Sequence, residues 1–558
     1  MSAEALDTVP HDIARARPRA ESLAHVLRSD DEALHTAQVL AERFAVDAAR
    51  RDSERVLPVR ELDACSKAGL WAMTVPREYG GAQVSYATVA RVFAILAAAD
   101  PSIAQIQQNH NSAVFWVWKT GNTQQRSFFL GEILRGARFG NANVDAGGRP
   151  ASGPAMRIVP ERGGFRLSGT KLYSTGMLFA DYVSTIGQDE QGCRIVAVVP
   201  AGHPGMKIVD DWQSFGQKTT ASGTVIFDDV WLPALNLLPI HHSYTHWPQN
   251  AVTQISHVGI DAGIARAALD ATIAFIRERD AAWTSGGSSG LSSPSSPSGS
   301  PDASAQLGAD PYVIHQIGEL LTRLHAAEAL MERAGREIDR CLADTGPDSI
   351  AAASIIVAQA KALTTEIALE ASSRLFELAG TRATHLSFNL DRHWRNARVH
   401  TVHDPVRWKY AAIGNFYLNG IRPPARRDTT WNQVTLRRLF FVRFTLDLLH
   451  WRSPMPGRRH FFAAGAALAA SSWIAPLGRA FAAPLDTIAL GSQKTGIPLV
   501  ARQLKVFEKR FEPCGIKVNW LEFPSGLVLL QALDMGRRIA FGNSGNVGCI
   551  FQQAAGET

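Results

Sequence analysis

The chain has 558 residues, a formal net charge of +6, 46% hydrophobic residues and 19% charged residues. This length exceeds what one hydrophobic core supports, and the modest charge without a basic stripe excludes a nucleic-acid-binding protein, so we expect several domains of an ordinary soluble protein. The five cysteines lie far apart without a C-x-x-C pair, which argues for a reducing compartment and against a disulfide framework or a zinc site.

Residues 1–28 are polar and interrupted by prolines, which predicts a tail without fixed structure. No charged and then apolar leader opens the chain, so we expect the first domain to stay in the cytoplasm. Over residues 29–138 apolar positions recur with a helical period, and Asp30 or Asp31 is placed to cap the first helix. This range predicts a helical domain.

His110 follows three polar residues on a helix of this domain that is otherwise apolar. A lone histidine in such a place is more often a core residue with satisfied hydrogen bonds than a catalyst. Local sequence leaves both interpretations open.

Between residues 139 and 240 the apolar period changes to two, with Gly and Asp turns between the runs. This predicts a small antiparallel β-domain inserted between helical domains. One strand ends at residues 173–176 with two hydroxyls and a glycine, which can present hydroxyls and backbone donors to a planar polar ring. On local sequence alone, an ordinary turn is the better interpretation.

Residues 241–425 are rich in Ala, Leu, Glu and Arg in long amphipathic runs, as in an antiparallel helical bundle. The segment 284–309 consists mainly of Gly, Ser and Pro, and it predicts a low-complexity loop between two helices.

A cluster of polar residues near the end of this bundle includes His400, His403 and Asp404. The proline after Asp404 disfavours helical geometry there, so we expect His403 and Asp404 at a helix exit, where side chains can point into a pocket. A solvated helix end is the alternative, but Trp394 and Trp408 on either side argue against it. A metal triad of the two histidines and the aspartate is a weaker alternative, because the proline break makes its geometry awkward.

Seven motifs occur in order between Ser29 and Arg422 on this helical, β and helical layout. They are residues 75–81, 139–142, 171–176, 210–212, 223–229, 376–382 and 391–405. Together they resemble the sulfur-acquisition (SfnB-like) branch of the acyl-CoA dehydrogenase superfamily, a relative of dibenzothiophene monooxygenase. The resemblance implies an α+β fold with an N-terminal helical domain, a middle antiparallel β-domain and a C-terminal four-helix bundle.

The dehydrogenases of this superfamily carry a catalytic glutamate in a Tyr-Glu-Gly-Thr loop, whereas the corresponding loop here reads Val402-His403-Asp404-Pro405. The resemblance therefore favours the monooxygenases, which use reduced flavin and O2 through a C4a-peroxyflavin. We expect a two-component, FMNH2-dependent monooxygenase that oxygenates organosulfur compounds for sulfur acquisition. An acyl-CoA dehydrogenase or oxidase remains the alternative enzyme.

The resemblance also implies the site residues. The catalytic residues would be His110, Asn141, Thr175, His400 and His403. The FMN-binding residues would be Asn141, Lys171, Leu172, Tyr173, Ser174, Thr175, Arg277, Thr381, Arg382 and His403. His403 and His400 would exchange a proton with the oxygen adduct, Thr175 would meet the N5 side of the flavin, and Thr381 with Arg382 would meet the phosphate.

One position departs from the family pattern. Relatives carry an arginine, a phosphate ligand, two residues before the tryptophan that ends the first bundle helix, and here Ala281 stands two residues before Trp283. Phosphate affinity is expected to fall unless Arg277 or Arg279 takes its place.

No Gly-x-Gly-x-x-Gly follows a strand, so the chain lacks the usual nicotinamide signature. Reduced FMN, rather than FAD, must then come from a separate NAD(P)H-dependent flavin reductase, with O2 as co-substrate. The resemblance further implies a homotetramer, and we expect neither nucleic acid nor a membrane as a partner.

The end of the chain has a different pattern. After a linker at 426–454, residues 455–483 resemble a signal peptide, and residues 484–558 resemble the start of a periplasmic aliphatic-sulfonate-binding protein. About 75 residues are too few for a two-lobed binding protein, so we expect an incomplete α/β lobe fused to a complete enzyme. A sulfonate-binding transport component is the alternative function from another class.

Overall fold

The computed structural model describes residues 24–146, 156–240, 243–284 and 306–423, with short pieces between 487 and 542. The chain divides into one unit of residues 1–429 and a second of residues 430–558, which are treated separately. The predicted tail is described only from residue 24. Most of the low-complexity loop, the linker and the signal-like segment lie outside the described residues.

Six α-helices precede the sheet in the described residues, as the helical period predicts. They are α1 (Asp30–Ala45), α2 (Ala48–Glu54), α3 (Val59–Lys67), α4 (Tyr86–Ala99), α5 (Pro101–Thr120) and α6 (Thr123–Leu134). The cap of α1 is Ser29, whose hydroxyl accepts a hydrogen bond from the Glu32 amide, and not Asp30 or Asp31. Asp30 instead accepts hydrogen bonds from the amide and hydroxyl of Ser85, one residue before α4.

Nine strands follow between residues 139 and 239. They are β1 (Phe139–Ala142), β2 (Val144–Asp145), β3 (Arg157–Glu161), β4 (Gly164–Ser174), β5 (Tyr182–Gln188), β6 (Arg194–Pro200), β7 (Met206–Val209), β8 (Gly223–Pro233) and β9 (Leu237–Pro239). The sheet order is β7-β8-β4-β3-β5-β6-β9, with β1 on β5 and β2 on β4. Most pairs are antiparallel, but β1 runs parallel to β5, because the chain passes through β2, β3 and β4 before it returns beside β1.

The last strand residues of β4 do not follow a regular ladder. The pairing of β4 with β8 shifts register between Lys171 and Ser174, and Tyr173 between them has a φ of 54°. A bulge of this kind turns the end of a strand and redirects its side chains. The predicted polar turn at residues 173–176 therefore begins inside the ladder.

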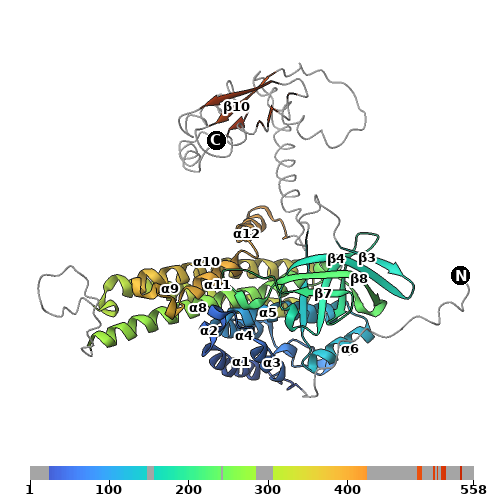
Figure 1. Cartoon of the computed structure of the whole chain (residues 1–558), viewed down its shortest axis with the longest axis horizontal. Coiled ribbons are helices and arrows are strands. Elements are labelled where there is room, and N and C mark those ends of the chain that lie inside the picture. Colours follow the sequence, from blue (N-terminus) through green and yellow to red (C-terminus); the bar gives the residue numbers. More distant parts are fainter. Residues whose placement is uncertain are drawn as a thin grey trace, which may run out of the picture. The chain divides into compact units, whose positions relative to one another are not determined.

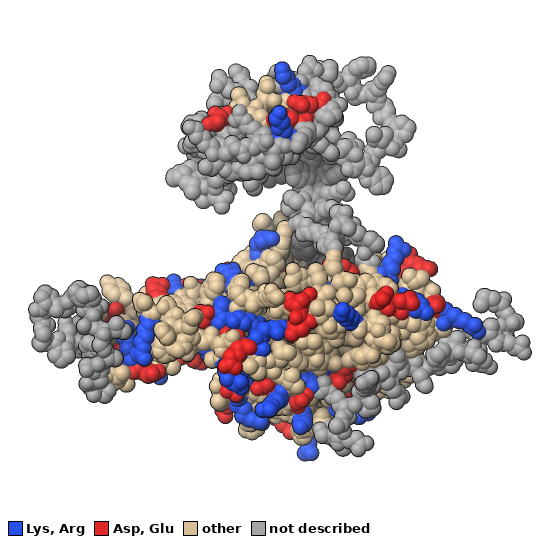
Figure 2. Space-filling view, in the orientation of Figure 1, with Lys and Arg blue, Asp and Glu red and all other residues tan. Residues whose placement is uncertain are grey.

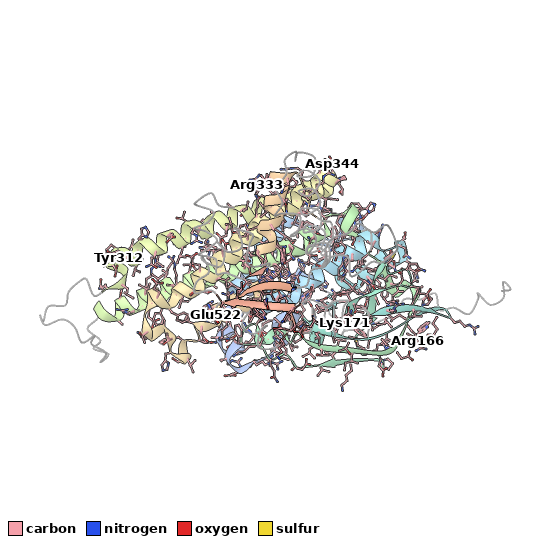
Figure 3. The ribbon with its side chains drawn as sticks, turned by 90° about the horizontal axis from the view of Figure 1, so that it is seen from above. Arg166, Lys171, Tyr312, Arg333, Asp344 and Glu522 are labelled. Atoms are coloured by element: carbon pink, nitrogen blue, oxygen red, sulfur yellow. The ribbon has the colours of Figure 1, made fainter. Side chains whose placement is uncertain are left out.

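The helical bundle contains three long helices and three short ones among the described residues. They are α7 (Ser243–His246), α8 (Gln249–Thr284), α9 (Pro311–Ala343), α10 (Pro347–Ala379), α11 (Asp391–Thr401) and α12 (Arg407–Asn419). The long helices run side by side, with the sheet at one end of them (Figure 1). In Figure 3, Tyr312 and Asp344 mark the two ends of α9. The most apolar window of α10 is long enough to cross a membrane but is 67% buried, as in a core helix.

Charged side chains of both signs are interspersed over the visible face of the first unit (Figure 2). Many form ion pairs between helices or along one helix. Arg266 lies 2.7 Å from Glu328, and Arg374 lies 2.8 Å from Glu370. Such pairs on a partly exposed surface contribute little to stability, so burial of apolar surface remains the main stabilising term of the bundle.

The second unit has three described strands, β10 (Thr487–Ser492), β11 (Lys517–Glu522) and β12 (Phe541–Gly542). They form a parallel sheet in the order β11-β10-β12. Glu522, labelled in Figure 3, ends β11. A parallel arrangement is typical of α/β folds, and the α/β lobe expected from the sequence stays a prediction.

Candidate functional site

A row of hydroxyl groups continues from the end of β4 toward β8. Thr175 Oγ1 lies 2.8 Å from Ser222 Oγ, and Ser222 Oγ lies 2.8 Å from Thr220 Oγ1. Thr220 donates to the carbonyl of Gln217 at 3.0 Å. Since each hydroxyl has one hydrogen, Ser222 then donates to Thr220 and Thr175 donates to Ser222. This hydroxyl relay (Thr175, Ser222, Thr220 and Gln217) leaves lone pairs on Thr175 Oγ1 for another donor.

Two buried polar atoms beside the hydroxyl relay have no hydrogen-bond partner among the described residues, Asn141 Oδ1 on β1 and Ser174 Oγ on β4. The Asn141 amide donates to the carbonyl of Thr175 at 3.3 Å, so the two strands meet at this point. A buried polar atom without a partner costs about 1–3 kcal/mol. Such atoms occur elsewhere in the described chain, but here they adjoin a free acceptor, which points to a polar ligand.

We call the hydroxyl relay together with Asn141 and Ser174 the β-domain wall. The backbone of this wall is strained. Tyr173, Gln217 and Ala221 have φ values of 54°, 45° and 47°, in the left-handed region that side chains disfavour. Each such residue costs on the order of 1–3 kcal/mol, and strain of this kind collects at ligand sites. Gln217 belongs to the hydroxyl relay, Ala221 lies between Thr220 and Ser222, and Tyr173 directly precedes Ser174, so the strained backbone and the unpartnered atoms occur in the same place.

Lys171, a predicted flavin contact, has its side chain inside the sheet. Its ammonium lies 2.7 Å from Asp145 Oδ1 and donates to the Ile186 carbonyl at 2.8 Å, and the residue is fully buried. Burial lowers the pKa of the Lys171 ammonium, and Asp145 offsets part of this shift. Figure 3 shows Lys171 nearer the helices than Arg166 of the same strand. Lys171 thus anchors β4, and the turn that follows it offers backbone groups and hydroxyls.

Helix α11 is fixed against this wall. Asn396 Oδ1 accepts a hydrogen bond from the Gln217 amide at 2.6 Å, and Arg395 binds Asp52 of α2 at 2.6 Å. At Gly216 an added Cβ would lie 2.1 Å from the carbonyl oxygen of Arg395. The loop before Gln217 can therefore reach α11 only because residue 216 has no side chain.

One turn after Asn396, His400 opens a second buried network. His400 Nδ1 lies 2.5 Å from Asp261 Oδ1, and His400 Nε2 lies 3.0 Å from His257 Nδ1. The other carboxylate oxygen of Asp261 pairs with Lys361 and accepts from the Thr365 hydroxyl at 2.6 Å. We call Asp261, His400 and His257 the histidine relay; none of the three is more than 1% exposed.

Within the relay, Asp261 is charged and His400 is neutral. Burial alone would raise the pKa of the Asp261 carboxyl, but Lys361 and His400 outweigh it and hold that pKa below its ordinary value. Burial lowers the pKa of the His400 imidazole, and Asp261 offsets part of the shift. Asp261 and Lys361 thus form a buried ion pair that orients a neutral His400 at neutral pH.

His403 lies just beyond α11, as the proline break predicts, and its side chain is exposed. Its ring stacks on that of His257, with centroids 4.6 Å apart and an interplanar angle of 26°. Asp404 is buried and pairs with Lys409 at 2.6 Å. The residues described by the structure contain no group of three or more His, Cys, Asp or Glu that could hold a metal ion.

His110 is fully buried, and both of its ring nitrogens bind the backbone. Nε2 lies 2.6 Å from the Trp71 carbonyl, and Nδ1 accepts from the Phe139 amide at 3.1 Å. Burial lowers the pKa of the His110 imidazole to about 4. The geometry makes His110 a neutral link between α5 and β1, so its predicted catalytic role stays a proposal that its contacts do not favour.

The predicted phosphate residues follow α10. Gly380, with a φ of 78°, ends the helix, and Thr381 and Arg382 are exposed after it, with the Arg382 guanidinium 5.3 Å from the Phe388 ring centroid. A Cβ at Gly380 would lie 3.9 Å from Arg279 Nη1. Of the two arginines expected to compensate for Ala281, Arg279 is therefore the one that reaches this corner, whereas Arg277 is exposed.

Sequence reasoning missed His257, Asp261, Lys361 and Ser222. A usable signal was present on α8 and α10, where His257 with Asp261 and Lys361 with Thr365 stand four residues apart within apolar helices. That spacing puts each pair on one helix face, and a buried polar face needs a partner on a neighbouring helix.

Two family domains match the first unit. Residues 31–137 match the acyl-CoA dehydrogenase N-terminal domain, and residues 255–408 match the acyl-CoA dehydrogenase C-terminal domain. Among curated relatives, dibenzothiophene monooxygenase of Rhodococcus erythropolis is 29% identical over 413 residues, covering 71% of this chain and 95% of the relative. The probable FMNH2-dependent monooxygenase SfnC of Pseudomonas putida is 28% identical over 402 residues, covering 70% and 96%.

Solved structures agree with these relatives. FMN-bound TdsC from Paenibacillus sp. A11-2 superposes with a TM-score of 0.64 at 27% identity, covering 71% of this chain and 99% of TdsC. The methanesulfinate monooxygenase MsuC of Pseudomonas fluorescens superposes with a TM-score of 0.61 at 28% identity, covering 70% and 98%. The predicted acyl-CoA dehydrogenase-like fold is confirmed.

Proposed function

We propose that this chain is a flavin-dependent monooxygenase of the acyl-CoA dehydrogenase superfamily and that it oxygenates organosulfur compounds with reduced FMN supplied by a separate reductase. The relatives named above support an FMNH2-dependent, two-component reaction. The observation in this structure that carries the proposal is the pair of unpartnered polar atoms, Asn141 Oδ1 and Ser174 Oγ, on a strained wall.

The residues of this wall fit FMN. The edge of a flavin ring carries both N–H donors and carbonyl acceptors, and the wall offers Asn141, the hydroxyl of Ser174 and the free acceptor of Thr175. Thr381, Arg382 and Arg279 would hold the phosphate, because guanidinium groups supply paired donors to phosphate oxygens. Leu172, half-buried, and Tyr173, exposed, would line the ring through the same turn.

Reduced FMN supplies two electrons and two hydrogens, so that one atom of O2 enters the sulfur compound and the other leaves as water. The protein has to orient the ring, keep water out and control one proton. Thr175 contributes orientation, because the hydroxyl relay turns its lone pair toward a donor. The long helices α8 and α10 contribute a buried, apolar surround.

His403 is the proposed proton donor and acceptor. It is exposed at the end of α11 and carries an imidazole, whose ordinary pKa lies close to neutral pH. His400 is fully hydrogen-bonded to Asp261 and His257, so it acts through its neighbours rather than on substrate. An acyl-CoA dehydrogenase reaction has less support, because no glutamate stands in the loop that carries His403.

The test compares His403→Ala with His385→Ala, a control at another exposed histidine. Wild-type protein, a flavin reductase, NADH and FMN are assayed for O2 uptake and product with sulfones, sulfonates and thiophenes. His403→Ala should bind reduced FMN within a few-fold of wild type but oxygenate about a hundred-fold more slowly and release more hydrogen peroxide. Unchanged product per NADH would remove His403 from the mechanism, and turnover without reductase would refute the two-component scheme.

The assembly is proposed to be a homotetramer in the cytoplasm. Trp408, Tyr417 and Leu418 on α12 are exposed apolar residues that offer surface for a subunit contact. Cys65, Cys193 and Cys341 are free thiols, in keeping with a reducing compartment. Light scattering of the purified chain measures the assembly, and a monomer at micromolar concentration would contradict it.

The second unit is proposed to correspond to the start of a sulfonate-binding protein. The parallel order β11-β10-β12 supports this, and the matched family domains end at residue 408. Calorimetry with alkanesulfonates, comparing the full chain with residues 1–429, tests it. Heat that is lost when residues 430–558 are removed would support a sulfonate site in this unit, and no heat with either protein would reject one.

A further inference from the structure

We propose that the histidine relay fixes the tautomer of His257, so that a neutral imidazole face is held under His403 and favours the protonated form of His403. Asp261, His400 and His257 are positioning residues in this proposal, and they act through His403. The inference rests on the proposed function for its meaning in the reaction, but the hydrogen-bond order can be tested without FMN.

The order of donors follows from Asp261. One carboxylate oxygen is paired with Lys361 and bonded by Thr365, and the other lies 2.5 Å from His400 Nδ1. A carboxylate can only accept, so His400 carries its hydrogen on Nδ1 and its Nε2 is a lone pair. His257 Nδ1, at 3.0 Å from that lone pair, must then be the donor.

This order puts a hydrogen on His257 Nδ1, and burial of the ring, which is 1% exposed, disfavours a second hydrogen on Nε2, so His257 is the neutral Nδ1–H tautomer in this proposal. Its ring lies parallel to that of His403, with the centroids 4.6 Å apart. A cation over a neutral aromatic face is attracted to it, whereas two stacked cations repel one another. The relay thus favours the protonated form of His403 only as long as His257 stays neutral.

Ionisable groups near this pair belong to several of the described elements. Asp261 and His257 belong to α8, Lys361 to α10 and His400 to α11. Asp404 and Lys409 pair with each other beside His403. The charges of Asp261 and Lys361 cancel, and neutral histidines leave the buried site without a net charge, whereas a cationic histidine would add a further desolvation cost.

An ion pair with a purely structural role would not need His400 and His257. Asp261 and Lys361 could join α8 to α10 with Thr365 alone, and two buried histidines in series add a desolvation cost without adding apolar contact. What the histidines add is a fixed direction of hydrogen bonding that ends at the ring under His403.

The first experiment is nitrogen-15 NMR of histidine-labelled, FMN-free full-length protein near neutral pH. His257 should show a protonated Nδ1 and a bare Nε2, and His400 should show the same pattern. The double variant Asp261→Asn with Lys361→Met removes both buried charges and lets an amide donate to His400 Nδ1, so both tautomers should reverse. A cationic His257, or an Nε2–H tautomer in wild type, would overturn the proposal.

The second experiment compares two variants of one residue. His257→Phe keeps an aromatic face without the hydrogen bond, and His257→Gln keeps a donor to His400 without the face. The pH at which His403 gains its proton should stay near wild type in the first and fall by about half a unit in the second, the scale of an exposed cation–π contact. Equal midpoints in all three proteins would overturn the proposal.

Wild-type NMR decides the hydrogen-bond order even if a variant fails to fold, and circular dichroism identifies such a variant. Failure of the proposed function is a separate result. If the tautomers are as stated but no organosulfur compound is oxygenated, the relay stands and the substrate class is wrong. If oxygenation is found but His257 is cationic, the function stands and the relay is wrong.

Discussion

The β-domain wall and the histidine relay both involve helix α11, yet they differ in how far their polar atoms are hydrogen-bonded. The wall leaves Asn141 Oδ1 and Ser174 Oγ without protein partners, whereas both ring nitrogens of His400 are hydrogen-bonded. Buried polar atoms without a hydrogen-bond partner are tolerated where a ligand can supply one. Fully hydrogen-bonded side chains are found where the protein must hold them in one orientation. Binding is therefore expected at the wall and positioning at the relay.

The largest expected effect is the loss of stability on substitution of Asp261 in the histidine relay. Asp261→Ala leaves the Lys361 ammonium buried without its partner, so the free energy of unfolding should fall by about 3–5 kcal/mol. Urea denaturation measures it. Asp270→Ala, at an exposed aspartate of the same helix, is the control and should change stability by less than about 0.5 kcal/mol. Equal losses would show that the buried pair is not special.

His110 predicts a pH dependence. Its pKa is about 4 in the folded protein and near 6.5 when unfolded, so acid protonates the unfolded chain first and stability is lost as the pH falls from about 6.5 to 4. Between about pH 8 and pH 5, His110 should account for about 2 kcal/mol of lost stability. His110→Gln can make the same two hydrogen bonds without titrating, so its stability should fall less over that range; an identical slope would contradict the assignment.

The wall should respond through ligand affinity rather than stability. Ser174→Ala removes a hydroxyl without a protein partner, so the FMN-free protein should keep its stability while FMN binds about tenfold more weakly. Fluorescence titration of FMN measures this. Ser66→Ala, at another buried hydroxyl without a partner in α3, is the matched control and should leave FMN affinity unchanged. A stability loss in Ser174→Ala would mean that its hydroxyl has a structural role.

The smallest effect concerns the phosphate corner. Arg279→Ala should weaken FMN binding several-fold, and more at low salt, because a guanidinium near Gly380 attracts the phosphate. Arg277→Ala serves as the control, since that side chain is exposed on α8. If Arg277→Ala has the larger effect, the compensation for Ala281 runs through the other arginine.

Much of the architecture could be predicted from the sequence, because helical and two-residue periods are local. The positions of His403 and Asp404 followed from one proline. The partners of His400 did not, because His257 and Asp261 lie 143 and 139 residues away on α8, and no local pattern encodes which face of α11 meets them.

Lys171 shows the other limit of sequence reasoning. The motif suggested a flavin contact, but the Lys171 ammonium is buried in the β-domain, where it pairs with Asp145 and donates to the Ile186 carbonyl. The bulge before Ser174 changes which side chains face the wall, and a one-residue shift in register is not visible in composition.

Gly216 determines how the β-domain wall is positioned against α11, the helix that carries His400 of the histidine relay. Where a methyl group would collide with the Arg395 carbonyl, its absence lets the Gln217 amide reach Asn396, one turn before His400. The Gln217 carbonyl also accepts the hydrogen bond from the Thr220 hydroxyl that ends the hydroxyl relay. The absence of a Cβ at residue 216 therefore sets the distance between the wall and α11. Any side chain at residue 216 would push Gln217 away from Asn396, so the proposed flavin contacts and the geometry of the histidine relay would be lost together.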